Sequence, residues 1–359
     1  MSGAGKQLSG KVAVFYDPIY LGHDTGMHPE SPGRLRHAVS HLKSSSINER
    51  LLWMPPRQAE DSEILLAHLP QHLETVRVLS ARGGGRIDLD TSVYPDSYQV
   101  AAWAVGGAIA AAEWAWQRGP GSFAVALVRP PGHHASSGSA GGFCLFNNVA
   151  VGARYLQRQG AERVLIVDWD LHHGNGTQEI FYSDPSVLYF SIHQHPAYPG
   201  TGSPEEIGRG PGRGYTVNFP VPPGTGDDDL AWIMSSVLMR LAAAFRPHAI
   251  AVSCGFDGYF ADPLGDLRLT VEGFGRLAAG IRDLAFQQQA PVFAVLEGGY
   301  HRDGIARGLE RVLAVWSGSP AELAPPTEPG AWVSRVMAMI RQHLADRWEV
   351  LADRGQLDI

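Results

Sequence analysis

The stretch RVLIVDWDLHHGNG, residues 163–176, predicts a strand with a ligand site at its end. Residues 164–167 are apolar and mostly β-branched, as in strands that are buried on both faces of a parallel sheet. Because side chains alternate along a strand, Asp168, Asp170 and His172 leave its end on the same side. Open α/β sheets bind ligands at this edge, so the three are candidate metal ligands. The alternative is that Asp170 caps a helix and that the histidines are exposed.

The composition is that of a globular enzyme with a large core. The 359 residues are 44% hydrophobic and 18% charged, with 42 glycines and 25 prolines, which fits a loop-rich catalytic domain. The net charge is −7 and the chain has no run of Lys or Arg, so we expect no direct nucleic-acid binding. An acidic surface is compatible with basic peptides or polyamines as partners.

Several features predict a cytoplasmic protein that does not cross a membrane. The N-terminal residues have no long apolar core, unlike a signal peptide. Cys144 and Cys254 are too few for a disulfide scaffold and suit a reducing compartment. The alanine-rich residues 100–116 are short and bracketed by polar side chains, so they predict a buried helix instead of a membrane span.

Strand-like and helix-like segments alternate along the chain. Short apolar runs occupy residues 12–16, 124–128, 164–167, 187–192, 249–253 and 292–296, and helical patterns occupy residues 34–43, 101–117, 149–158, 230–245 and 274–288. This alternation predicts an α/β fold with a mostly parallel central sheet and helices on both faces. No linker divides the chain, so we expect one catalytic domain over residues 1–359. A C-terminal helix over about residues 331–351 is expected to pack on it, with a subunit contact as the alternative.

Three more of these strands end in polar residues. The strand at 124–128 leads into RPPGHH, which presents His133 and His134, a pair suited to proton transfer. The strand at 249–253 leads to Asp257, a further oxygen ligand, and the strand at 292–296 leads through EGG to Tyr300. Taken singly, each has a structural explanation: a surface loop for the histidines, a helix cap for Asp257, and packing for Tyr300. Together at one edge of a sheet they predict an active site.

Motifs along most of the chain resemble the histone deacetylase superfamily, which includes the acetylpolyamine amidohydrolases. The matching stretches are HPESPGR at 28–34, DT at 90–91 with PDSY at 95–98, RPPGHH at 129–134, GFC at 142–144, DWDLHHGNG at 168–176, YPGTG at 198–202, GFD at 255–257 with DPLG at 262–265, and EGGY at 297–300. The first and last of these resemble the class II branch more than class I. The resemblance implies an arginase/deacetylase-like single domain with about eight mostly parallel strands.

The resemblance also implies one Zn²⁺ ion per chain, held by Asp170, His172 and Asp257. Two carboxylates and an imidazole suit a catalytic zinc site that keeps coordination positions free. A second metal is not expected, because Leu171 and His173 add no carboxylate. A K⁺ ion behind the zinc is implied as well, with these residues around it: Asp168, Asp170, His172, Ser191 and Ile192.

In the family pattern, the two adjacent histidines differ in their partners. His133 pairs with Asp168 and is expected to be the more readily charged. His134 pairs with a position that is a carboxylate in class I relatives but is Asn175 here. We therefore expect His134 to be neutral at pH 7 and to act first as general base and then as general acid. Tyr300 is expected to donate its hydroxyl to the oxyanion, a contribution of about 3 kcal/mol.

The resemblance implies a narrow substrate channel. Gly142, Phe143 and Tyr198 match its walls, and apolar rings suit the methylene stem of an acyl-lysine. Asp96 matches a position that binds backbone amides of the substrate. Leu264 stands where polyamine-selective class II relatives carry a glutamate.

These residues predict a zinc-dependent amidohydrolase that removes acetyl or related acyl groups from Nε-acyl-lysine of proteins or peptides. A small acylated amine such as an acetylpolyamine is the alternative substrate, with Glu205 or Glu206 as the acidic selector that Leu264 cannot be. An alternative of another class is a catalytically silent acyl-lysine-binding protein, which would not need the full set of site residues. The sequence leaves the oligomeric state open, a homo-oligomer included.

Overall fold

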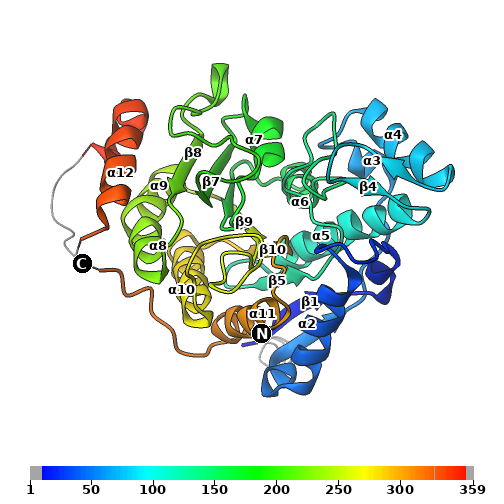
Figure 1. Ribbon diagram of the computed structural model, residues 1–359. Coiled ribbons are helices and arrows are strands. Elements are labelled where there is room, and N and C mark those ends of the chain that lie inside the picture. Colours follow the sequence, from blue (N-terminus) through cyan, green and yellow to red (C-terminus); the bar gives the residue numbers. More distant parts are fainter. Residues whose placement is uncertain (1–9, 327, 353–359) are drawn as a thin grey trace.

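The computed structural model describes residues 10–326 and 328–352, and its centre is an eight-stranded sheet (Figure 1). The strands lie in the order β2-β1-β5-β10-β9-β6-β7-β8, and all neighbours are parallel. This confirms the α/β class and the parallel sheet. The strands are β1 (Val12–Phe15), β2 (Leu51–Met54), β5 (Phe123–Ala126), β6 (Val164–Asp168), β7 (Val187–Gln194), β8 (Thr216–Val221), β9 (Ala249–Cys254) and β10 (Val292–Leu296).

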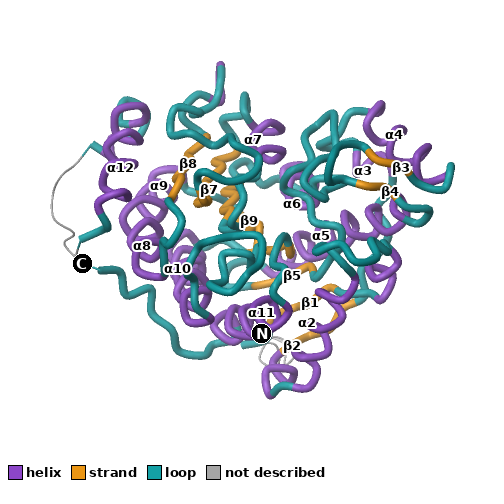
Figure 2. The backbone as a smooth tube through the Cα atoms, in the orientation of Figure 1, coloured by secondary structure: helices purple, strands orange, loops and turns teal. Residues whose placement is uncertain are grey.

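Helices cover both faces of the sheet (Figure 2). Helices α5 and α6 pack on each other and contact the strands, whereas α11 packs between α2 and α10, and α8 and α9 contact α10. A two-stranded ribbon, β3 (Gly85–Arg86) and β4 (Ser92–Val93), lies beside α4. The helices are α2 (Pro32–Ser44), α3 (Asp61–Ile64), α4 (Pro70–Ala81), α5 (Ser97–Arg118), α6 (Asn148–Arg158), α7 (Asn175–Phe181), α8 (Asp227–Ile233), α9 (Met239–Phe245), α10 (Val271–Gln288), α11 (Arg302–Trp316) and α12 (Ala331–Leu344).

All six strands predicted from the sequence are present, with ends that shift by at most two residues. The sequence did not predict the two edge strands. Strand β2 runs directly into Pro55 and Pro56, and β8 contains Pro220; proline suits an edge strand but weakens the strand pattern. The helix expected over residues 230–245 is divided by a π-helical turn at Met234–Leu238.

The C-terminal helix α12 packs beside the edge strand β8. Trp332 Nε1 donates a hydrogen bond to the carbonyl oxygen of Pro220 at 3.1 Å, and Val336 and Ile340 are buried. The helix ends at Leu344, and only a 3₁₀ turn at Glu349–Leu351 follows, so a single helix over 331–351 is wrong at its C-terminal end. Among the residues that the structure describes, no helix combines the length and apolarity that a membrane crossing requires.

The four strands that carry the predicted polar residues are neighbours in the middle of the sheet, in the order β5-β10-β9-β6. Because they are parallel, their carboxyl ends share one edge. The loops after these strands therefore bring residues from positions 129 to 300 into one place.

Candidate active site

The three candidate metal ligands lie together at the ends of β6 and β9. One oxygen of Asp170, one of Asp257 and a ring nitrogen of His172 lie within 4.8 Å of one another. His172 Nδ1 is 3.3 Å from Asp170 Oδ1 and 3.0 Å from Asp257 Oδ2. Both carboxylates are buried, whereas the imidazole is partly exposed. The cluster can therefore be reached by a ligand from the surface.

Backbone N–H groups hold both carboxylates in place. Asp170 accepts hydrogen bonds from the N–H groups of His172 and Gly298, and Asp257 accepts one from Leu171. These bonds hold both carboxylates where each has an oxygen near His172 Nδ1.

The charges of this cluster call for a cation. Burial and the charge of Asp170 raise the pKa of Asp257 to about 7. Burial opposes a charge on His172, but its hydrogen bonds to Asp170 and Asp257 raise the pKa of the imidazole to about 10. The three side chains thus hold a proton between them when no other cation is present. A divalent cation would satisfy both carboxylates at once, and this set of oxygen and nitrogen donors fits Zn²⁺.

His133, in the loop after β5, lies next to this cluster. Its Nδ1 is 3.0 Å from Asp168 Oδ2, and its Nε2 is 3.7 Å from Asp170 Oδ1. Burial opposes a charge on His133, but the charges of Asp168 and Asp170 outweigh it and raise the pKa to about 10. His133 is therefore the charged member of the histidine pair.

His134 has a neutral partner. Its Nδ1 lies 2.8 Å from Asn175 Oδ1, at the start of α7. Because an amide oxygen only accepts, Nδ1 of His134 carries the proton and Nε2 keeps a free lone pair. Burial lowers the pKa of His134 well below its ordinary value, and the charges of His133 and His172 lower it further. The result is a neutral base whose ring centre is 6.0 Å from that of His172.

Tyr300 lies on the loop after β10. Its N–H group donates to Asp262 Oδ2 at 2.6 Å, and the Arg34 guanidinium lies 4.7 Å from the centre of its ring. The hydroxyl makes no hydrogen bond to any residue within the described ranges. Burial raises the pKa of Tyr300 well above its ordinary value. The hydroxyl therefore stays protonated and can donate a hydrogen bond to a ligand.

Aromatic rings from two loops flank this cluster. The Tyr198 ring centre is 5.0 Å from that of His134, and the Phe143 ring centre is 5.9 Å from that of Tyr300. Phe143 has a φ of 69°, and the preceding Gly142 has a φ of 53°, in the left-handed region. A Cβ atom at Gly142 would lie 2.3 Å from the His134 ring. This backbone conformation, which is costly for a phenylalanine, places its ring at the site.

Comparison with known proteins identifies the family of this chain. Residues 28–316 match the family model of the histone deacetylase domain. The chain belongs to the histone deacetylase family. A probable deacetylase of Archaeoglobus fulgidus is 41% identical over 81% of both chains, and the histone deacetylase-like amidohydrolase of Pseudomonas aeruginosa is 34% identical over 96% of both. The crystal structure of the HDA15 HD domain superposes with a TM-score of 0.87 at 36% identity, covering 95% of this chain and 98% of that one.

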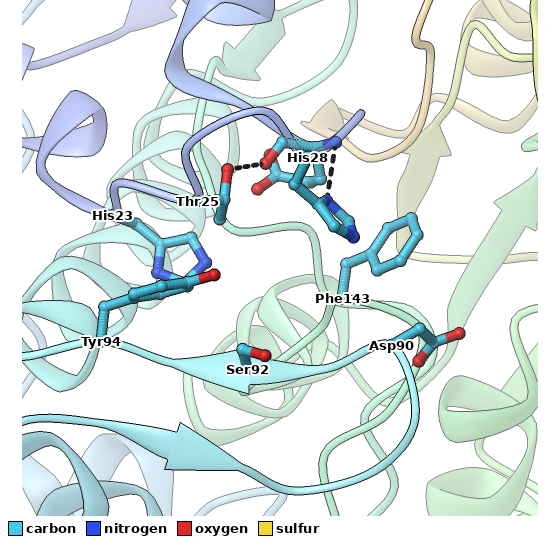
Figure 3. Close-up of a pocket in the computed structure, with 8 residues that line it drawn as sticks. His23, Thr25, His28, Asp90, Ser92, Tyr94 and Phe143 are labelled. Carbon is cyan, nitrogen blue, oxygen red and sulfur yellow. Dashed lines mark hydrogen bonds between the residues drawn. The ribbon is translucent and has the colours of Figure 1, made fainter.

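Within this histone deacetylase fold, Asp96 is not among the residues that line the small pocket beside Phe143. It is exposed at the N-cap of α5, and no hydrogen bond among the described residues joins it to Phe143. The carboxylate near Phe143 is Asp90, which lines a small pocket together with His28 (Figure 3). The His28 and Phe143 ring centres are 4.5 Å apart. Asp90 therefore lies beside Phe143 in this pocket, and the substrate-binding role of Asp96 stays a prediction.

The two glutamates considered as polyamine selectors have different surroundings. Glu206 accepts the N–H groups of Gly202 and Ser203 and a hydrogen bond from Gln178, so it holds the loop after Tyr198. Glu205 is exposed. Leu264 is exposed on the loop in which Asp262 holds Tyr300. Its side chain is therefore an apolar group on the surface of this loop.

The residues expected around K⁺ adjoin the candidate metal ligands. Asp168 and Ser191 are paired in the register of β6 and β7, and Ile192 follows on β7. Ser191 Oγ lies 2.9 Å from His193 Nδ1, and Asp168 Oδ1 accepts the N–H group of Asp170. The ends of β6 and β7 thus bring the Asp168 carboxylate and the Ser191 hydroxyl close together.

Sequence reasoning assigned no role to the charges of the HPESPGR motif. Glu30 is buried and accepts hydrogen bonds from both Arg129 and Arg34. Arg34 also donates to the carbonyl oxygens of Glu297 and Gly299, at 2.6 and 2.5 Å. Through Arg34, the motif therefore holds the backbone of the loop that carries Tyr300. The signal was present in the sequence, since a charged pair spaced i, i+4 at the start of a helix suits an ion pair.

Metal binding to the triad can be measured through stability. Adding Zn²⁺ to metal-free protein should raise its Tm, because a ligand that binds only the folded state stabilises it, by about 4 kcal/mol at 1,000 times Kd. Asp257→Asn should greatly reduce this shift, whereas the exposed Asp228→Asn should keep it. Differential scanning fluorimetry gives the shift, and elemental analysis should find one metal ion per chain. An unchanged shift in Asp257→Asn would contradict the site.

Proposed function

We propose that this protein is a zinc-dependent hydrolase that removes acetyl or related acyl groups from Nε-acyl-lysine of proteins or peptides. The observation that carries the proposal is that three side chains able to bind a cation lie together with a neutral base, His134, and with the protonated hydroxyl of Tyr300. The family match supports deacetylase chemistry. A silent acyl-lysine-binding protein would need neither the base nor the phenol.

Asp170, His172 and Asp257 would hold the zinc ion, which supplies Lewis-acid polarisation of the acyl carbonyl and of the attacking water when it is bound. The surrounding residues then manage protons. His134 Nε2, with its free lone pair, takes a proton from the water and later gives it to the leaving amine. The Tyr300 hydroxyl donates a hydrogen bond to the oxyanion.

The other predicted site residues have supporting roles in this proposal. Asp168 keeps His133 charged, so that the positive imidazolium next to His134 keeps that base neutral. A K⁺ ion among Asp168, Asp170, His172, Ser191 and Ile192 would hold the strand end of the triad in place. The free cysteines, Cys144 and Cys254, are consistent with a reducing compartment and support a cytoplasmic location.

Peptide substrates are favoured by the surroundings of the channel. The Phe143 and Tyr198 rings suit the methylene chain of acyl-lysine. Met27 and Leu89 are exposed and adjoin the pocket residues His28 and Asp90. Apolar side chains at a rim suit the flanking residues of a peptide better than the distal ammonium of a polyamine.

A substrate panel tests the proposal directly. Purified protein loaded with Zn²⁺ should hydrolyse acetyl-lysine peptides with a higher kcat/KM than acetylputrescine or acetylspermidine, and a chelator should abolish both activities. Product amines are measured by mass spectrometry. Hydrolysis of the acetylpolyamines alone would replace the peptide substrate by the alternative, and binding of acetyl-lysine without hydrolysis would favour the silent reader.

Tyr300→Phe removes the oxyanion donor and leaves the ring. We expect kcat to fall about 100- to 1,000-fold, as with other oxyanion donors. The metal content should stay the same, because the hydroxyl is not among the triad atoms. Steady-state kinetics and elemental analysis check both statements. Tyr198→Phe is the matched control, since its ring lies next to His134 but its hydroxyl has no step in this reaction.

Asn175→Asp should shift the pH profile. A carboxylate next to His134 Nδ1 favours the charged imidazole and raises its pKa. A general base must be neutral, so the acidic limb of the kcat profile should move to higher pH. Kinetics at a series of pH values measure the shift, and Asn175→Ser, which adds no charge, is the control. If the Asp variant keeps the acidic limb of the wild type, His134 is not the base.

A further inference from the structure

A buried carboxylate beside the site has no role in the reaction as described so far. Glu297 follows β10 and is 1% exposed. Its Oε2 accepts hydrogen bonds from the N–H groups of Gly132 at 2.6 Å and His133 at 3.2 Å. Its Oε1 has no hydrogen-bond partner among the described residues. Burial of a half-satisfied carboxylate is unfavourable, so the position calls for a compensating function.

The turn that carries the catalytic histidines is held from three sides. Asn148 Nδ2 donates to the carbonyl oxygen of Pro130 at 3.1 Å, and the N–H group of Thr177 donates to that of His133 at 3.0 Å. Those two bonds hold carbonyl groups of the turn, whereas Glu297 accepts hydrogen bonds from two of its N–H groups. It is the support that comes from β10, the strand whose loop also carries Tyr300.

The backbone at Glu297 is itself fixed. Arg34 donates to the carbonyl oxygens of Glu297 and Gly299, and the N–H group of Gly298 donates to Asp170 Oδ2 at 2.8 Å. A change in the reach of the Glu297 side chain therefore moves the histidine turn, not the loop. The same short segment, 297–300, connects the turn with Tyr300.

We propose that Glu297 is a positioning residue for the reaction proposed above, because its side chain sets the distance between the His133–His134 turn and Tyr300. The role rests on the proposed function. A base and an oxyanion donor that act on one carbonyl must both keep their places, and a displacement of about 1 Å can cost about 100-fold in rate.

The length of the side chain can be separated from its charge by two substitutions. Glu297→Gln keeps the reach and an oxygen that can accept both N–H groups, but it removes the charge. Glu297→Asp keeps the charge and shortens the reach by one methylene. We expect Glu297→Gln to keep kcat within about 5-fold of the wild type, and Glu297→Asp to lose about 100-fold with KM within about 3-fold.

A matched control changes a similar contact away from the site. Asp227 at the start of α8 accepts the N–H group of Thr270 at 2.9 Å. Asp227→Asn should leave kcat unchanged, although it weakens a carboxylate contact of the same kind. The metal content of all variants should equal that of the wild type, which excludes an indirect effect on the triad.

The order of the two variants decides the proposal. Loss of kcat in Glu297→Gln with retention in Glu297→Asp would overturn it, as would a loss that appears in KM or in metal content. A crystal structure of Glu297→Asp gives a readout that does not depend on the reaction: the histidine turn should be displaced relative to Tyr300. An undisplaced turn overturns the inference, whereas a wild type that is inactive on every acyl amine overturns only the proposed function.

Discussion

Two carboxylates buried side by side are the constraint on which the site depends. Asp170 and Asp257 extend from the ends of the adjacent strands β6 and β9, and neither is exposed by more than 1%. Backbone N–H donors reduce the repulsion between these buried charges, and a bound cation would offset it further. The backbone must also approach closely: a Cβ atom at Gly255 would lie 2.0 Å from Asp170 Oδ2, and one at Gly298 would lie 2.2 Å from Asp257 Oδ2. Only glycine fits at these positions.

The parallel sheet explains how residues distant in sequence come together around these two carboxylates. In a parallel sheet every strand ends at the same edge, and the central order β5-β10-β9-β6 places the four polar strand ends next to one another. The strands supply mostly apolar packing, apart from polar residues at their ends such as Asp168 of β6. The chemistry lies in the first few residues after each strand, where side chains such as His134 and Tyr300 are held by loops that are in turn held by buried polar contacts.

The sequence predicted the central strands and the residues at their ends, because a buried parallel strand leaves a strong apolar pattern and a polar stop. It did not predict the edge strands β2 and β8, which are followed by proline or contain it. It could not predict that Asp90 lies next to Phe143, because this contact depends on how the loop before β4 folds. The contact of Glu297 with a turn 165 residues away is invisible for the same reason. Such pairings depend on tertiary packing and leave no local periodicity.

The difference between the two histidines follows from their partners alone. His133 and His134 are adjacent in sequence, both are buried, and their ring centres are 4.0 Å apart. Burial disfavours a charge on either ring. Asp168 reverses this preference for His133, and the amide of Asn175 does not do so for His134. Once His133 is charged, its field further disfavours a second charge next to it. One carboxylate and one amide thus give the site a fixed positive group and a free base within a single turn.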